Sequence, residues 1–265
     1  MATGSLQVNR DIILATRKQH LKQQMKYTPI DAVLALAQMQ QRPRSILNYS
    51  SDRHAIMLIV QISRHEVYDP VTSALHCLYN GANAVSFFTD HSIYHNDLDD
   101  MLLLARAMSD VPVLYQNYIT DEYEVMAARA ANASGVFLYS GLVPPQQLRR
   151  IVSMAQRWKM TTIVQVASDA ELDYALTVSP HALAFGDNLS SNVPTTAAYL
   201  QTVRDDLPSY VKTMLVNTIY TVDDLRLALD ARVDAVILDE SLMKNERHAR
   251  AVGEMISAEE DARRN

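Results

Sequence analysis

Eight short runs of apolar, β-branched and aromatic residues recur along this chain, and their starts lie about 21 to 29 residues apart. Segments with the spacing of amphipathic helices fill the gaps, and this alternation is typical of a parallel sheet covered by helices. Eight such units favour a closed barrel over an open sheet. The predicted strands are Ile56–Ile62, Ala84–Thr89, Val113–Tyr115, Val136–Tyr139, Thr161–Val166, Ala182–Phe185, Val211–Val216 and Ala235–Leu238.

Capping residues and early prolines predict where the intervening helices begin, because they satisfy the free backbone N–H groups of a first turn or need none. The clearest signals are Asp69-Pro70, Thr120-Asp121, Pro144-Pro145, Ser168-Asp169 and the segment 221–224. The fold expected from these patterns is α/β, a single eight-stranded parallel β/α (TIM) barrel over residues 56–265.

Residues 1–55 are predicted to form a helical extension packed on the barrel within one structural domain. Two amphipathic helices are expected there, near Asp11–Tyr27 and Pro29–Gln41, covering the barrel bottom or an entrance. The first helix carries a row of basic residues that we interpret as a solvated face: Arg17, Lys18, Lys22 and Lys26.

Charge and cysteine content narrow the classes of function. The formal net charge of −6 offers no basic face for nucleic acid, so no nucleic-acid partner is expected. No apolar run is long enough to cross a bilayer, and the first residues lack the apolar core of a signal peptide, which predicts a protein of the cytoplasm or another reducing compartment. The single cysteine, Cys77, lies in an apolar pattern and is interpreted as a buried structural thiol. No cofactor or metal site is predicted.

Several segments resemble indole-3-glycerol-phosphate synthases, and they follow the family's order along nearly the whole chain. They are YDPVTSALHCLYNGANAVSFFTD (68–90), DVPVLYQNYITDEYEVMAARAANASGVFL (110–138), TVDDL (221–225), DAVILDESLM (234–243) and the early helix ILATRKQHLKQQM (13–25). The resemblance implies a β/α barrel. It also implies a decarboxylative ring closure of a phosphorylated anilino sugar in tryptophan biosynthesis, with lysines as acids, glutamates as their partners and a phosphate held at the last two strands.

The same resemblance allows the family's catalytic positions to be checked one by one. The first-strand pattern Ala-Glu-Ile-Lys-Lys corresponds to residues 60–64, which places Gln61 at the glutamate and Ser63 at the catalytic lysine. The third-strand pattern Leu-Arg-Lys-Asp-Phe corresponds to residues 114–118, which places Gln116 at the general-acid lysine. The family's long loop after the first strand is about half as long here.

Later strands differ from the family in the same way. Gln165 stands at the glutamate of Val-Glu-Val-His, and Asp187 stands at the sixth-strand asparagine. The seventh-strand Glu-Ser-Gly corresponds to Asn217, Thr218 and Ile219. Amides and hydroxyls do not ionise near neutral pH, and no catalytic lysine or glutamate remains at the aligned positions, so the alignment predicts no catalytic residue there.

The expected phosphate site changes as well. Ile219 adds a branched side chain where the family has glycine, and Asp239 adds a negative charge in the eighth-strand Gly-Glu-Ser pattern, here Asp239-Glu240-Ser241. The whole chain has only six glycines, where average usage of roughly 7% would give about eighteen. Phosphate binding at this position should therefore be weak.

Three functions remain open, and we favour the first. In the first, the chain is an inactive barrel that serves as a binding, scaffold or regulatory subunit of a larger assembly with a protein partner. In the second, it is a repurposed enzyme or small-molecule binder that uses the barrel mouth, and in the third it retains synthase activity. Contact candidates for a ligand or partner are Tyr115, Tyr118, Tyr139, Tyr220, Asp239, Glu240 and Ser241, although the tyrosines are equally explained as filling the mouth. Acid–base candidates for a repurposed enzyme are Asp187, Asp239, Glu240, His65 and His91.

Overall fold

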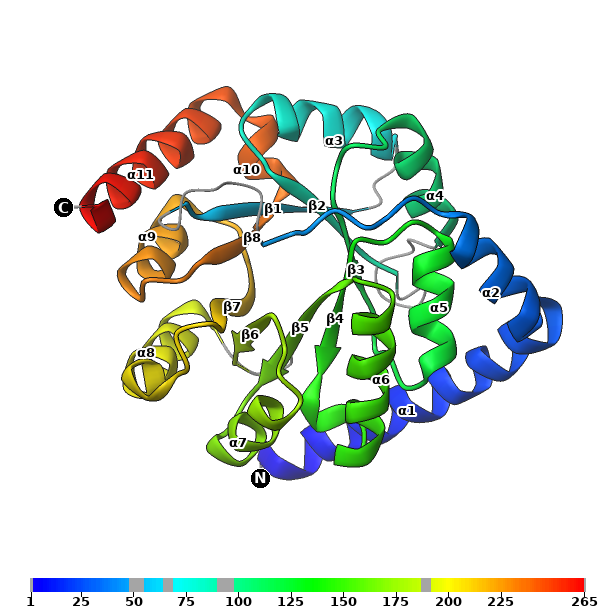
Figure 1. Ribbon diagram of the computed structural model, residues 1–265. Coiled ribbons are helices and arrows are strands. Elements are labelled where there is room, and N and C mark those ends of the chain that lie inside the picture. Colours follow the sequence, from blue (N-terminus) through cyan, green and yellow to red (C-terminus); the bar gives the residue numbers. More distant parts are fainter. Residues whose placement is uncertain (1, 48–54, 64–68, 90–97, 187–191, 265) are drawn as a thin grey trace.

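All eight predicted apolar runs form parallel strands, which close into one barrel in sequence order (Figure 1). The computed structural model describes residues 2–47, 55–63, 69–89, 98–186 and 192–264, with side chains from residue 11 onward. The predicted TIM barrel is confirmed. The strands are β1 (Met57–Ile62), β2 (Ala84–Phe88), β3 (Val113–Gln116), β4 (Gly135–Tyr139), β5 (Thr161–Val166), β6 (Ala182–Phe185), β7 (Lys212–Ile219) and β8 (Ala235–Asp239).

The five helix starts that the capping signals predicted are confirmed. Asp69, Asp121, Ser168 and Thr221 each accept a hydrogen bond from a first-turn backbone N–H. The helices are α3 (Pro70–Tyr79), α4 (Leu98–Ala107), α5 (Glu122–Ala130), α6 (Pro145–Arg157), α7 (Asp169–Thr177), α8 (Val193–Val203), α9 (Val222–Asp230), α10 (Glu240–Lys244) and α11 (Glu246–Arg264), with short 3-10 turns η1 (Ser140–Leu142) and η2 (Arg204–Asp206).

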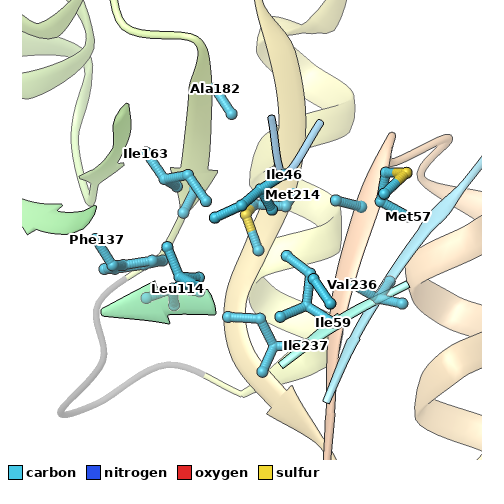
Figure 2. Close-up of a cluster of buried hydrophobic side chains, with 14 of the residues drawn as sticks. Ile46, Met57, Ile59, Leu114, Phe137, Ile163, Ala182, Met214, Val236 and Ile237 are labelled. Carbon is cyan, nitrogen blue, oxygen red and sulfur yellow. The ribbon is translucent and has the colours of Figure 1, made fainter. Parts of the chain in front are cut away.

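The inside of the barrel is filled by apolar side chains that converge from several strands (Figure 2). Ile46, which comes before the first strand, is fully buried at the N-terminal end of the barrel. Its backbone N–H donates to Thr161 Oγ1 at 3.2 Å. Gly135 makes room for it, because a Cβ at that position would lie 2.6 Å from Ile46 Cδ1. Ile46 therefore packs into the N-terminal end of the barrel, against the starts of β4 and β5.

Two helices precede the barrel, α1 (Ala2–Tyr27) and α2 (Ile30–Met39). α2 lies along the outer side of α5 (Figure 1), where it buries Val33 and Ala37. α1 lies near the C-terminal ends of β2 and β3, because its Arg17 binds Glu124 in the first turn of α5. The N-terminal segment thus contacts both ends of the barrel, the mouth through α1 and the bottom through Ile46.

Two further expectations concern burial and membranes. Cys77 is fully buried in α3, which confirms the structural-thiol interpretation. Burial raises the pKa of this thiol to about 12. Among the described residues, no helix has both the length and the hydropathy that a membrane span requires.

Candidate functional site

Three buried glutamines lie at the C-terminal ends of alternate strands, and each is hydrogen-bonded within the barrel. Gln61 on β1 accepts from the Thr218 hydroxyl at 3.1 Å. Gln116 on β3 donates to the Ser86 hydroxyl, and Gln165 on β5 donates to the carbonyl of residue 186. Burial without such partners would cost each amide free energy, and here other strands, or the residue that follows one, supply them. The mouth is polar, yet these groups carry no charge.

Two other positions of the family pattern contact residues of the surrounding helices. The backbone N–H of Ser63, just after β1, donates to Glu240 at 3.4 Å. Asn217 on β7 accepts a hydrogen bond from Thr196 of α8 at 2.9 Å. β7 ends three residues later than predicted, at Ile219, since its pairing with β8 resumes after a register shift between Met214 and Thr218. Three candidates, Asp187, His65 and His91, lie outside the described residues.

Aromatic rings pack against one another beside the glutamines. Tyr118 stacks edge-on against Phe88, with ring centroids 5.4 Å apart, and it lies 5.2 Å from the ring of Tyr139. Tyr115, Tyr118 and Tyr139 are all buried, whereas Tyr220 is exposed. Of the four tyrosines predicted as contact candidates, Tyr220 alone lies at the protein surface. The buried rings fill space at the strand ends.

The turn from β8 into α10 carries the remaining candidates. Asp239 caps α10, because its Oδ1 accepts from the backbone N–H of Ser241 at 3.0 Å and also from the Ser241 hydroxyl. Glu240 is buried, and one of its carboxylate oxygens lies 2.7 Å from Lys244 Nζ. Two carboxylates and their own donors therefore occupy the turn where the resemblance places a phosphate.

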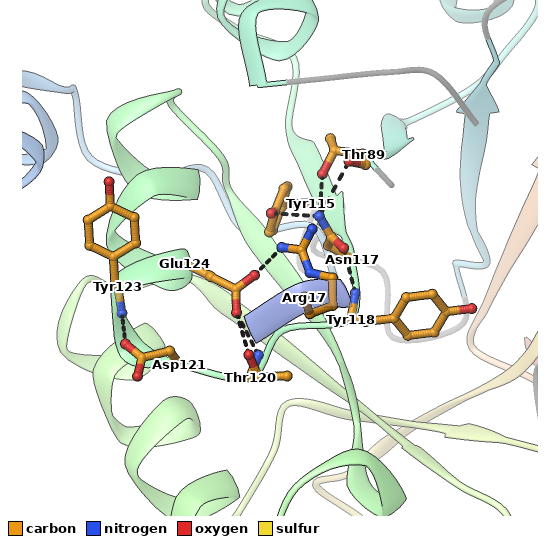
Figure 3. Close-up of polar contacts among 9 residues, drawn as sticks. All are labelled: Arg17, Thr89, Tyr115, Asn117, Tyr118, Thr120, Asp121, Tyr123 and Glu124. Atoms are coloured by element: carbon orange, nitrogen blue, oxygen red, sulfur yellow. Dashed lines mark hydrogen bonds and ion pairs between the residues drawn. The ribbon is translucent and has the colours of Figure 1, made fainter. Parts of the chain in front are cut away.

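A buried polar network under α1 was not predicted from the sequence (Figure 3). Arg17 forms an ion pair with Glu124, whose other oxygen accepts from the Thr120 backbone N–H at 2.7 Å. Beside this pair, the Asn117 amide donates to the Tyr115 hydroxyl at 3.1 Å and to Thr89. Burial, and then the nearby Glu124 carboxylate, raise the pKa of Tyr115.

The expectation that Arg17 belongs to a solvated basic face is wrong. Arg17 is 5% exposed, whereas Lys18, Lys22 and Lys26 are exposed as expected. Its position four residues before the buried Leu21 was the available signal, since residues four apart share one helix face.

A cavity of 480 Å³ opens beside this network, between α1, the ends of β2 and β3, and the start of α4. Its lining includes the buried Arg17, Tyr115 and Asn117, together with His20 and Asp99. Within the ranges that the structure describes, no group of three or more His, Cys, Asp or Glu side chains is arranged to hold a metal ion. The cavity therefore offers hydrogen bonds, one paired cation and an aromatic wall.

The sequence profile of the family described as "Indole-3-glycerol phosphate synthase" matches residues 10–255. Three relatives carry the same name. The protein of Dichelobacter nodosus is 24% identical over an alignment of 265 residues. The alignment covers 95% of this chain and 98% of that protein. The protein of Chromobacterium violaceum is 25% identical, covering 93% and 97%. The protein of Bordetella pertussis is 31% identical over 182 residues, which are 68% of each chain.

Solved structures share the fold at low identity. The 3-hexulose-6-phosphate synthase of Salmonella typhimurium superposes with a TM-score of 0.65 at 11% identity, covering 77% of this chain and 100% of that one. KGPDC of Streptococcus mutans gives a TM-score of 0.62 at 11% identity, covering 77% and 98%. A likeness at this level concerns the fold alone. Because the family profile spans residues 10–255, this chain belongs to the indole-3-glycerol phosphate synthase family.

Proposed function

We propose that this chain is a catalytically inactive member of its family, which serves as a binding or scaffold subunit of a larger assembly. The proposal depends on one observation above all. At the strand ends where the resemblance places glutamate and lysine, Gln61, Gln116 and Gln165 are buried and hydrogen-bonded to barrel groups. None of these amides takes up or releases a proton near neutral pH.

The loss of these acid and base groups should lower the reaction rate by a large factor. A general acid or base contributes roughly 10²–10⁴-fold to a rate, so losing two or more removes most of an enzyme's advantage over the uncatalysed reaction. The Arg17–Glu124 pair does not replace them, because a guanidinium stays protonated across the physiological range.

Anion binding at the mouth is opposed by charge. The Asp239 carboxylate already accepts the hydrogen bonds of Ser241 at the start of α10. A phosphate placed there would lose those donors and would face a like charge, which costs about 1 kcal/mol at 4 Å even in water. Ile219, buried on β7, fills space where the family has glycine. These features argue against a phosphorylated substrate at this position.

The test is an assay of the purified chain for formation of indole-3-glycerol phosphate, with the Bordetella pertussis relative assayed in parallel as the positive control. We expect no turnover above the uncatalysed background, and no rescue of a tryptophan auxotroph that the relative does rescue. Turnover at an ordinary enzyme rate would refute the inactive-barrel proposal. Purification of the chain from its own cells at low salt then identifies the protein that accompanies it.

A small-molecule binder is the second candidate, and the 480 Å³ cavity beside α1 favours it. The cavity has the size of a ligand site and is lined by buried polar side chains. If a metabolite co-purifies with the chain and no other protein does, the small-molecule binder is favoured over the scaffold. An Asn117→Leu variant should then lose the metabolite and keep the fold.

A further inference from the structure

A second cavity adjoins the cavity beside α1. It measures 220 Å³ and lies between the end of α1 and the helices α2, α4 and α5. Four residues line both cavities, and none of them is buried, so they form no packed partition between the two: Gln24, Thr28, Leu98 and Asp99. The two cavities therefore form one continuous groove, which we call the α1 groove.

The α1 groove lies on the outer side of the barrel wall, apart from the mouth. Successive side chains of a strand point to opposite faces. Leu114 on β3 belongs to the cluster inside the barrel (Figure 2), so Gln116 points inward as well and Tyr115 points outward. Tyr115 and Asn117 lie beside Arg17 of α1 (Figure 3). A ligand in the groove would therefore contact Tyr115 and leave the glutamines of the mouth untouched.

The smaller cavity is mainly apolar. Ala127 and Ala130 form part of its wall on α5, and because their side chains end at Cβ they leave room beside the helix. Side chains of α2 and α4 line the other sides: Val33, Leu36, Leu98 and Leu102. The Tyr123 hydroxyl, which also lies here, already donates to the Thr28 carbonyl at 2.8 Å. This end of the groove therefore suits an apolar group.

The larger cavity offers hydrogen-bonding groups in fixed positions. The Asn117 amide donates to the hydroxyls of Thr89 and Tyr115, at 2.9 Å and 3.1 Å, and all three residues are buried. Gln23 and His20 of α1 add an amide and an imidazole on the opposite side. Hydroxyls and amides both donate and accept, so they can bind the hydroxyl or amide groups of a ligand.

The charges on the walls favour an uncharged ligand. Among the described residues that line the groove, the charged side chains are Arg17 and Asp99. Arg17 is buried and paired with Glu124. An anion would have to separate this pair, which is costly for buried charges, and would lie near Asp99. A cation would meet the Arg17 guanidinium, and water weakens its attraction to the exposed Asp99.

We propose that the α1 groove binds an uncharged amphipathic molecule of small-metabolite size. Its apolar chain or ring lies between α2, α4 and α5, and its hydroxyl or amide groups lie under α1 against Tyr115 and Thr89. The larger cavity alone, at 480 Å³, has the volume of ordinary small-molecule sites, which is about 300–1,000 Å³. Such sites also combine apolar walls with a few placed polar groups, as this groove does.

The ligand class rests on the second candidate function, small-molecule binding beside α1. It does not depend on whether the barrel mouth is catalytic, because the groove and the mouth lie on opposite sides of β3. A synthase assay tests the mouth, whereas a binding titration tests the groove. Either proposal can therefore fail while the other stands.

Isothermal titration of the full chain with three octyl compounds tests the ligand class without any variant. The probes are octyl β-glucoside, octanoate and octyltrimethylammonium, each kept below the concentration at which it forms micelles. We expect the glucoside to bind at least about tenfold more tightly than either ion, because a charged head group must lose its water beside a cation that is already paired. Methyl β-glucoside, which lacks the chain, should bind at least about tenfold more weakly than the octyl compound.

Two pairs of variants test where the glucoside binds. Leu36→Asp places a charge at the apolar end and should weaken binding at least about tenfold. Its matched control is Leu34→Asp, on the same helix, which lines neither cavity and should leave binding unchanged. Tyr115→Phe removes a hydroxyl from the polar end and should weaken binding roughly threefold to tenfold. Tyr118→Phe, whose ring points away from Arg17 in Figure 3, should not.

Four results would overturn the proposal. If none of the probes binds the wild type, the groove is no small-molecule site, and the second candidate function loses its support as well. If octanoate or the ammonium compound binds as tightly as octyl glucoside, the uncharged class is wrong while small-molecule binding stands. If methyl glucoside binds equally well, the ligand needs no apolar end. If Leu36→Asp or Tyr115→Phe binds no more weakly than its control, the ligand lies elsewhere.

Discussion

Asp239 and Ser241 are hydrogen-bonded to each other at the point where β8 ends and α10 begins. The Asp239 carboxylate accepts a hydrogen bond from the Ser241 backbone N–H at 3.0 Å, and the Ser241 hydroxyl donates to the same oxygen. Backbone N–H groups in a first helical turn attract anions. In this chain the Ser241 N–H and the Asp239 carboxylate belong to the same turn. The N–H group is therefore already hydrogen-bonded to an anion of the chain itself.

Replacement of Asp239 tests how much this cap stabilises the protein. Asp239→Ala should lower the free energy of unfolding by about 1 kcal/mol, the usual effect of losing a side-chain cap. Asp239→Asn keeps an oxygen acceptor and should lose much less. Urea denaturation of both variants measures the difference, and an equal loss in the two would show that charge matters here more than the hydrogen bond.

The Arg17–Glu124 ion pair joins α1 to the first turn of α5, and both side chains are buried. Arg17→Met should lower the free energy of unfolding by about 3–5 kcal/mol, because it leaves the Glu124 carboxylate buried without its counter-charge. The matched control is Lys18→Met, one position away and exposed, which should change stability by less than about 0.5 kcal/mol. Thermal or urea unfolding gives both values.

A second substitution separates loss of charge balance from loss of packing. Glu124→Gln removes the charge and keeps an oxygen that can accept from the Thr120 backbone N–H. The double variant Arg17→Met, Glu124→Gln should therefore be more stable than Arg17→Met alone. If it is less stable, the arginine acts mainly through the packing of its aliphatic stem.

His181 should make stability depend on pH. Burial lowers its pKa, and its Nδ1 lies 3.1 Å from the Thr162 backbone N–H, so the ring accepts this hydrogen bond in its neutral form. The unfolded chain takes up a proton near pH 6.5, before the folded chain does. The contribution of His181 is therefore complete above about pH 6.5 and is lost as the pH falls toward the lower folded-state pKa.

Unfolding free energies of the wild type and of His181→Gln, measured from about pH 7.5 to about pH 5, isolate this effect. The wild type should lose stability relative to the variant as the pH falls. Parallel profiles would mean that the imidazole is protonated to the same extent in both states.

Replacement of glycine by alanine should change the free energy of unfolding in opposite directions at Gly186 and Gly253. Gly186 has a φ of +117°, and a Cβ there would lie 2.1 Å from Thr196 Cγ2 and 2.8 Å from Val216 Cγ1. Gly186→Ala should lower the free energy of unfolding by several kcal/mol through backbone strain and overlap, roughly 1–3 kcal/mol from each. Gly253→Ala, inside α11 with no atom near its Cβ, should raise it by up to about 1 kcal/mol. Chemical denaturation compares the two directly.

The regular spacing of apolar runs was sufficient to predict the barrel, because buried parallel strands and the helices between them have local signatures. The helix starts at Asp69, Ser168 and Thr221 were predictable for the same reason, since a cap involves residues two or three positions apart. The burial of Cys77 followed from its apolar surroundings. The end of β7 was not predictable, because its last residues pair with β8 only after a register shift.

What the sequence determined by itself was the fold and the chemical character of the barrel mouth, since amides at strand ends remain amides in any packing. What only the tertiary structure decided was which groups meet. Arg17 is buried because Glu124, 107 residues later, lies beneath α1. Tyr118 and Tyr139 fill the mouth because two neighbouring strands bring their rings within 5.2 Å. Such pairings depend on barrel closure, which sets distances between residues that no local pattern connects.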